Sequence, residues 1–205
     1  MIKNNRTWKV VTKMSNETNK STDGAEKKMD WKKELLSWVM YLGFVLLLTW
    51  FILTFIGQRT VVDGRSMNAT LNDRDNLIVE KLSYRFSDPE RFDIIVFPPY
   101  GTKEYYIKRI IGMPGETVQI DSEGNIFIND ELLEENYGLE TIKHPGRALE
   151  PVTLGEDEYF VLGDNRNNSI DSRDERVGNI KRDAIIGRAW VRIWPLADIG
   201  FLKHQ

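Results

Sequence analysis

The stretch EYYIKRIIGMPGE, residues 104–116, has the composition of a β-strand that ends in a turn. Aromatic and β-branched residues favour strands, and the Met-Pro-Gly that follows them interrupts one. Side chains alternate between the two faces of a strand, so Lys108 shares a face with Tyr106 and Ile110, and Arg109 lies on the opposite face. Two large residues therefore flank Lys108 and can shield its ammonium group from water.

Similar strand-like segments lie on both sides of this one, each bounded by turn-forming residues. They are residues 59–64, 75–84, 92–99, 158–163 and 184–194, and residues 117–130 indicate a hairpin that turns at 123–125. Residues 134–151 contain two Gly and two Pro, which predict an irregular inserted subregion. We therefore expect a mostly β fold class, with a folded-sheet or barrel-like catalytic domain that contains little helix.

Before the first of these segments, residues 35–58 form an apolar run of 24 residues without a charge. A helix needs roughly 20 apolar residues to cross the bilayer core. A cleaved signal peptide would have a shorter run and a small-residue exit, and a buried core helix is seldom apolar all round at this length. The run predicts a single transmembrane helix over residues 35–57.

The charges beside this helix predict its orientation. Four lysines precede it, Lys27, Lys28, Lys32 and Lys33, whereas only Arg59 stands at its far end. The positive-inside rule then assigns residues 1–34 to the cytoplasm as a polar, disordered tail, and residues 58–205 to the outside as an extracytoplasmic domain. The predicted location is the cell membrane, with a single pass and the lipid bilayer as a partner.

Composition excludes several classes of function. Residues 59–205 carry 19 Lys and Arg against 26 Asp and Glu, so the domain lacks the basic face that a nucleic-acid partner requires. The absence of cysteine excludes disulfides, thiolate metal sites and a cysteine nucleophile. The two histidines, His144 and His204, lie in polar or terminal contexts that suggest neither a triad nor a zinc site. We expect no metal and no cofactor.

A candidate nucleophile occurs in DGRSMNATL, residues 63–71, a few positions after the apolar run. A serine nucleophile needs a base within hydrogen-bond reach, and a desolvated, neutral lysine can replace histidine in that role. Lys108 is the lysine whose neighbours can desolvate it. On spacing alone two interpretations stay open: Lys108 as the base for Ser66, or an edge-strand lysine that discourages aggregation.

A third polar segment, GDNRNNSIDSR at residues 163–173, directly follows the apolar YFVL. Asp and Asn favour turns, so a long surface loop is one interpretation. The spacing of Asp171 and Arg173 lets them pair on one face of an extended segment, and a buried serine hydroxyl here could orient a lysine amine.

Together these segments resemble type I signal peptidases, the membrane-anchored serine proteases that remove signal peptides from exported proteins. The resemblance rests on SM followed by TL at 66–71, on KRIIGMPGE at 108–116, on GDNRNNSIDSR and on GRAWVRIWP at 187–195. It implies that Ser66 is the nucleophile of an acyl-enzyme mechanism and Lys108 the general base. It also implies substrates with small residues at positions −1 and −3 of the cut. Three further roles follow from it: Ser169 orients Lys108, Asp171 and Arg173 brace the site, and Arg109 and Asp164 support it.

Two positions depart from the family pattern. Ala69 stands where the family usually has proline, which removes a constraint on the loop after Ser66. Gly64 stands where some members have a serine that donates to the oxyanion, so the oxyanion would rely on the backbone N–H of Ser66.

Two alternatives belong to other classes of protein. A self-cleaving repressor peptidase uses the same pair of residues, but it is cytosolic and carries a DNA-binding module where this chain has its apolar run. A membrane-anchored binding or scaffold protein would retain the fold without the reaction.

Overall fold

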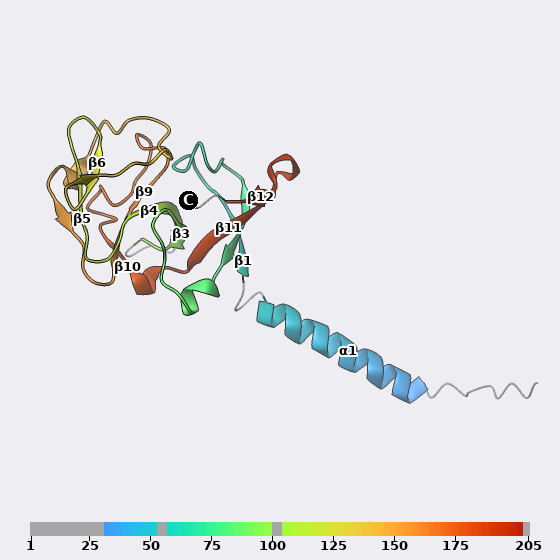
Figure 1. The fold of residues 1–205 in the computed structure, drawn as a ribbon. Helices are drawn as coiled ribbons and strands as arrows, with labels where there is room; N and C mark the ends of the chain where they lie inside the picture. Colours follow the sequence, from blue (N-terminus) through green and yellow to red (C-terminus); the bar gives the residue numbers. More distant parts are fainter. Residues whose placement is uncertain (1–30, 53–56, 100–103, 203–205) are drawn as a thin grey trace, which may run out of the picture. The chain divides into compact units, whose positions relative to one another are not determined.

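The computed structural model describes residues 31–52, 57–99 and 104–202, which form one long helix and a β domain (Figure 1). The mostly β fold class is confirmed. Besides α1, the described helices are short 3₁₀ turns. They are η3 Ser83–Arg85, η4 Gly146–Leu149, η5 Arg182–Ala184 and η6 Leu196–Asp198.

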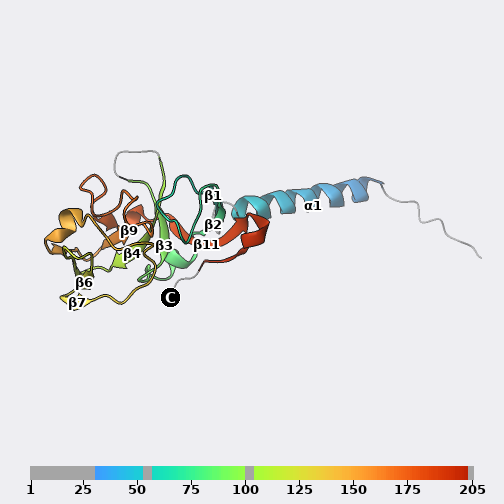
Figure 2. The same ribbon diagram turned by 90° about the horizontal axis from the view of Figure 1, so that it is seen from above.

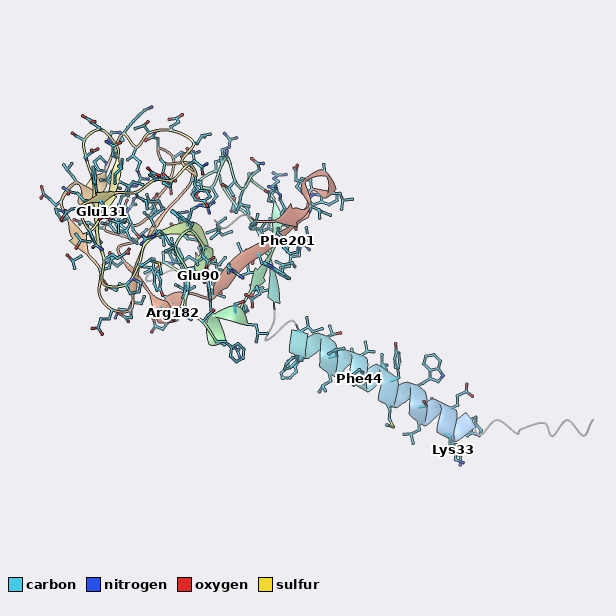
Figure 3. All side chains as sticks on the ribbon, viewed as in Figure 1. Lys33, Phe44, Glu90, Glu131, Arg182 and Phe201 are labelled. Atoms are coloured by element: carbon cyan, nitrogen blue, oxygen red, sulfur yellow. The ribbon has the colours of Figure 1, made fainter. Side chains whose placement is uncertain are left out.

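Helix α1 spans Trp31–Phe51, and none of its residues is buried. Its length and composition are sufficient to cross a membrane, because 21 residues at 1.5 Å each extend about 30 Å. Side chains project around its whole circumference, Lys33 and Phe44 among them (Figure 3).

The bounds of α1 differ from the predicted span of residues 35–57. The helix begins at Trp31, since Lys32, Lys33 and Glu34 are good helix formers and helical hydrogen bonding does not stop where charges appear. Gly57 is not helical but pairs with Glu80 in the first strand. Of the predicted tail over residues 1–34, residues 31–34 form the start of α1, and residues 1–30 lie outside the described residues.

The larger sheet has eight antiparallel strands, in the order β1-β2-β11-β3-β4-β9-β10, with β12 on β11. The strands are β1 Gly57–Val61, β2 Asn76–Glu80, β3 Ile94–Phe97, β4 Tyr106–Gly112, β9 Glu158–Leu162, β10 Ile180–Lys181, β11 Gly187–Trp194 and β12 Gly200–Phe201. The strand β11, although near the end of the chain, lies between β2 and β3 (Figure 1). Strand order therefore does not follow chain order.

The smaller sheet has four strands in the order β7-β6-β5-β8. They are β5 Thr117–Ile120, β6 Ile126–Ile128, β7 Glu131–Leu132 and β8 Val152–Thr153. The pairing of β5 with β6 is the hairpin expected over residues 117–130. Within the β domain, β6 and β7 lie at the opposite end from β1 and β2 (Figure 2).

Strand β4 lies at the centre of the larger sheet, with β3 on one side and β9 on the other. The sequence pattern correctly placed Lys108 and Arg109 on a strand, but both are buried, at 4% and 0% exposure. Apolar clusters cover both faces of a central strand, whereas an edge or surface strand has one face in water. The interpretation of Lys108 as an edge-strand lysine is therefore wrong.

The far end of β11 and the short β12 carry exposed apolar side chains. They are Trp190, Trp194, Leu196, Ile199 and Phe201, and the rings of Trp190 and Phe201 lie 5.4 Å apart. Phe201 is at the opposite end of the domain from Glu131 of β7 (Figure 3).

Candidate active site

The loop between β1 and β2 presents Ser66. Met67 and Leu71 follow it in sequence and are fully buried in the core, so they anchor the loop while Ser66 stays partly accessible. Gly64 has a φ of 94° and donates its backbone N–H to Asp73 Oδ1 at 2.9 Å. A serine at position 64 would be strained in this left-handed conformation, which explains the departure from the family pattern in this chain.

Lys108 reaches Ser66 from β4. Its Nζ lies 2.8 Å from Ser66 Oγ and 3.0 Å from the carbonyl oxygen of Ile107, to which it donates. Burial lowers the pKa of Lys108 from its ordinary 10.5 to about 8, although the charges of Asp171 and Asp164 oppose the fall. Burial outweighs the two carboxylates because water is lost on nearly every side of the amine. A fraction of Lys108 is therefore neutral near neutral pH, with its amine in contact with the Ser66 hydroxyl.

Ser169 lines the same cleft as Ser66 and Lys108. Its Oγ is buried and makes no hydrogen bond to any described residue, Lys108 included. A buried hydroxyl without a partner is unusual, because its desolvation is uncompensated. The role of Ser169 in orienting Lys108 stays a prediction. Because the Oγ of Ser169 has no partner among the described residues, it is available to donate or accept the hydrogen bond that this role requires.

Gly163 is a residue that sequence reasoning missed. A Cβ at this position would overlap Ser169 Oγ and lie 2.5 Å from the carbonyl oxygen of Ser66. Only glycine lets these two serines approach each other across the end of β9. The signal was present in the sequence, as a glycine between a buried strand and a run of polar residues.

Asp171 and Arg173 form a two-bond ion pair. Arg173 Nε donates to Asp171 Oδ1 at 2.8 Å and Nη2 donates to Oδ2 at 2.9 Å. Asp171 also accepts the backbone N–H of Gly163 at 3.0 Å, and Arg173 donates to the carbonyl oxygen of Arg166 at 2.6 Å. The pair therefore holds both ends of the 163–173 loop in place.

Arg109 and Asp164 form a second ion pair with no exposed surface. Nε and Nη2 of Arg109 donate to the two carboxylate oxygens at 2.9 and 2.7 Å, and the guanidinium lies 3.6 Å from the centre of the Tyr137 ring. Thr70, which sequence reasoning also missed, donates its hydroxyl to Asp164 Oδ2 at 2.5 Å. Because Thr70 belongs to the Ser66 loop, this contact ties that loop to the 163–173 loop.

A cleft of about 730 Å³ opens over these groups. Residues 60–67, 104–108 and 167–170 line it, so it combines the Ser66 loop, the start of β4 and the tip of the 163–173 loop. Of the two histidines, His144 contributes a backbone carbonyl oxygen to Arg173 at 3.2 Å, and His204 lies outside the described residues. The arrangement suits acyl transfer, because a hydroxyl and an amine that burial helps to keep neutral meet in an open cleft.

A serine hydroxyl beside a buried lysine amine in an open cleft is an arrangement that suits a serine hydrolase. Comparison with known proteins gives the family: the model for "Signal peptidase, peptidase S26" matches residues 35–194. The chain therefore belongs to the signal peptidase family, and it is an enzyme of the serine peptidase class.

Several relatives carry the same name. The chain is 42% identical to a probable signal peptidase I-2 of Synechocystis sp., over 75% of this chain and 71% of that protein. It is 42% identical to a signal peptidase I of Leptolyngbya laminosa, over 82% of this chain and 84% of that protein. A crystal structure of a signal peptidase I from Enterococcus faecalis is 34% identical, with a TM-score of 0.40, and covers 50% of this chain and 97% of that one.

Proposed function

We propose that this chain is a membrane-anchored serine endopeptidase that removes N-terminal signal peptides from exported preproteins with a Ser66–Lys108 dyad. The observation that carries the proposal is the 2.8 Å contact between Ser66 Oγ and the buried Lys108 Nζ. A protonated lysine cannot accept a proton, and burial lowers the pKa of Lys108 to about 8, which makes the neutral form available.

The chemistry proceeds in two halves. Neutral Lys108 takes the proton of Ser66 as Oγ attacks the carbonyl carbon before the cut, and an oxyanion forms on the former carbonyl oxygen. The tetrahedral intermediate collapses, the C–N bond breaks, and the Lys108 ammonium gives its proton to the leaving amine. Lys108 then deprotonates a water molecule that attacks the ester. Its ammonium returns that proton to Oγ as the C–Oγ bond breaks, which regenerates the Ser66 hydroxyl and the neutral amine and releases the carboxyl-terminated signal peptide.

Two features support a substrate at the membrane surface. Ser66 follows Gly57 of β1 by nine residues, so an extended chain of about 3.3 Å per residue keeps it within roughly 30 Å of that strand's first residue. The exposed Trp190 and Trp194 of β11 belong to a residue type enriched where membranes meet water. We infer an anchor in α1 with the amino terminus in the cytoplasm and the catalytic domain outside. Small residues at positions −1 and −3 of the preprotein are part of the same proposal.

The full chain in detergent, incubated with a purified signal-bearing precursor, tests this function. We expect the wild type to release the mature protein and Ser66→Ala to release none. Ser122→Ala serves as a matched control, because Ser122 is an exposed serine in the turn between β5 and β6. Equal cleavage by Ser66→Ala and the wild type would reject the dyad, and absence of cleavage by the wild type would favour the binding or scaffold class.

A further inference from the structure

Asn165 contacts the peptide groups on both sides of the nucleophile. Its backbone N–H donates to the carbonyl oxygen of Ser66 at 3.0 Å, and its Nδ2 donates to the carbonyl oxygen of Arg65, also at 3.0 Å. Asn165 belongs to the loop after β9 and is a hundred residues later in the chain. One side chain of the 163–173 loop therefore holds the main chain that carries Ser66.

The direction of the Ser66 N–H follows from this contact. In a trans peptide the C=O and N–H groups point in opposite directions, and the Arg65–Ser66 peptide is not among the cis bonds. Because Nδ2 of Asn165 binds the Arg65 carbonyl oxygen, the Ser66 N–H points away from Asn165. No described residue accepts a hydrogen bond from this N–H, and Ser66 lines the cleft.

The neighbouring donor is already engaged, since the Gly64 N–H is bound to Asp73. The Ser66 N–H is thus a donor of the nucleophile loop that remains for an oxygen in the cleft. A carbonyl oxygen that accepts a hydrogen bond also polarises its own peptide group, which makes the N–H a stronger donor.

We propose that Asn165 is a positioning residue for the oxyanion: it fixes the Arg65–Ser66 peptide so that the Ser66 N–H faces the carbonyl oxygen of the bond being cut. This inference rests on the proposed function, because it assumes that Ser66 attacks a peptide carbonyl. Asn165 contacts Ser66 at its backbone carbonyl oxygen and not at Oγ, it makes no described hydrogen bond to Lys108, and it acts on the reaction only through the main chain.

The expected kinetic effect is specific. Asn165→Ala leaves the Ser66 N–H in place and removes one of two hydrogen bonds to the Arg65 carbonyl oxygen, the other coming from the Asn68 N–H at 3.2 Å. The orientation of the Ser66 N–H is then less constrained, so kcat should fall about tenfold, less than the 10²–10³-fold that follows complete loss of an oxyanion donor. KM should stay within twofold, because the contact gains strength only as negative charge develops. The midpoint of the pH–rate profile should not move, since burial of Lys108 sets it and Asn165 does not touch Lys108.

Two companion variants sharpen the test on the full chain in detergent. Asn165→Asp places a carboxylate, which has no proton to donate, against the Arg65 carbonyl oxygen, and it should lose at least as much kcat as Asn165→Ala. Gln119→Ala is the matched control: Gln119 Nε2 donates to the carbonyl oxygen of Leu149 at 3.1 Å, also an exposed amide-to-backbone contact, but in the smaller sheet. Gln119→Ala should keep the wild-type kcat.

Hydrogen exchange of the backbone amides over residues 63–68 gives a readout that needs no turnover. Exchange should accelerate in Asn165→Ala and stay at the wild-type rate in Gln119→Ala. Unchanged exchange, a kcat within twofold of the wild type, or a shifted pH midpoint in Asn165→Ala would each overturn the inference. Failure of the wild type to cleave any precursor would instead reject the proposed function, and the exchange data would still decide whether Asn165 holds the peptide.

Discussion

Replacement of Lys108 by methionine should make the protein inactive and more stable at pH 7. The variant keeps the apolar stem and removes the amine. In the wild type, folding with a buried ammonium costs about 3 kcal/mol, which corresponds to a pKa lowered from 10.5 to about 8. Methionine forfeits the contacts of Nζ with Ser66 and Ile107, each of which contributes about 1 kcal/mol net. We therefore expect Lys108→Met to gain about 1–2 kcal/mol at pH 7.

The gain must disappear as the pH rises. Between pH 8 and 10.5 the unfolded wild-type chain retains a proton at Lys108 that the folded chain has released, so wild-type stability increases with pH over this interval. Lys108→Met has no proton to release, and its advantage should shrink by about 3 kcal/mol and reverse by pH 10.5.

Chemical unfolding of both full-length proteins in detergent, at pH 7 and pH 10.5, measures this difference. Other groups titrate in both proteins and cancel when the two are compared. A free-energy difference that is the same at both pH values contradicts a desolvated lysine. A Lys108→Met variant that is less stable than the wild type by more than about 1 kcal/mol at pH 7 would also contradict a desolvated lysine. That result would identify Lys108 as a structural charge partner.

Four further predictions concern the reaction and the membrane. The kcat/KM of the wild type should rise tenfold per pH unit below about 8 and level off above it, as Lys108 becomes neutral; a flat profile from pH 6 to 9 would exclude Lys108 as the base. Gly163→Ala should lose more than tenfold in activity and about 1–3 kcal/mol in stability, because its Cβ overlaps Ser169 Oγ; wild-type turnover would show that the loop can relax. Ser169→Ala should lose activity without losing stability, because the hydroxyl it removes has no partner among the described residues; a drop in melting temperature would instead reveal a structural role. Protease added to intact cells should digest the catalytic domain and spare an amino-terminal tag, and a carboxy-terminal tag that is reached only after permeabilisation would reverse the orientation.

The local parts of the fold could be predicted because they depend on local chemistry. The hairpin of β5 and β6 follows from alternating apolar residues and a turn at Gly124, whose φ is 88°. The order of the larger sheet could not be predicted, because the place of β11 between β2 and β3 depends on contacts between segments about a hundred residues apart. For the same reason the alternation in 104–112 identified the strand but not the burial of both its faces.

The residues of the candidate site also fall into two groups, those recognisable from their own chemistry and those whose roles depend on residues distant in the sequence. Ser66 and Lys108 were identifiable because a nucleophile and a base need particular residue types. Gly163, Thr70 and Asn165 were missed because their roles depend on what approaches them: a serine side chain, a buried carboxylate and a peptide carbonyl. No property of glycine, threonine or asparagine in isolation indicates such a neighbour.

The position of β11 has a consequence for the time at which the enzyme acquires its reactive pair during synthesis. Ser66 follows β1 and precedes β2, and Lys108 lies on β4, which joins the sheet through β3. The link between β2 and β3 is β11, residues 187–194, and of the described strands in this sheet only β12 is translated later. Ser66 and Lys108 are thus both translated before the strand that unites their halves of the sheet has been made. About 80 residues separate Lys108 from β11. At roughly 5–20 residues translated per second, several seconds therefore pass in which the growing chain carries Ser66 and Lys108 but not their contact. The Ser66–Lys108 contact, and with it the proposed peptidase activity, can form only after that interval.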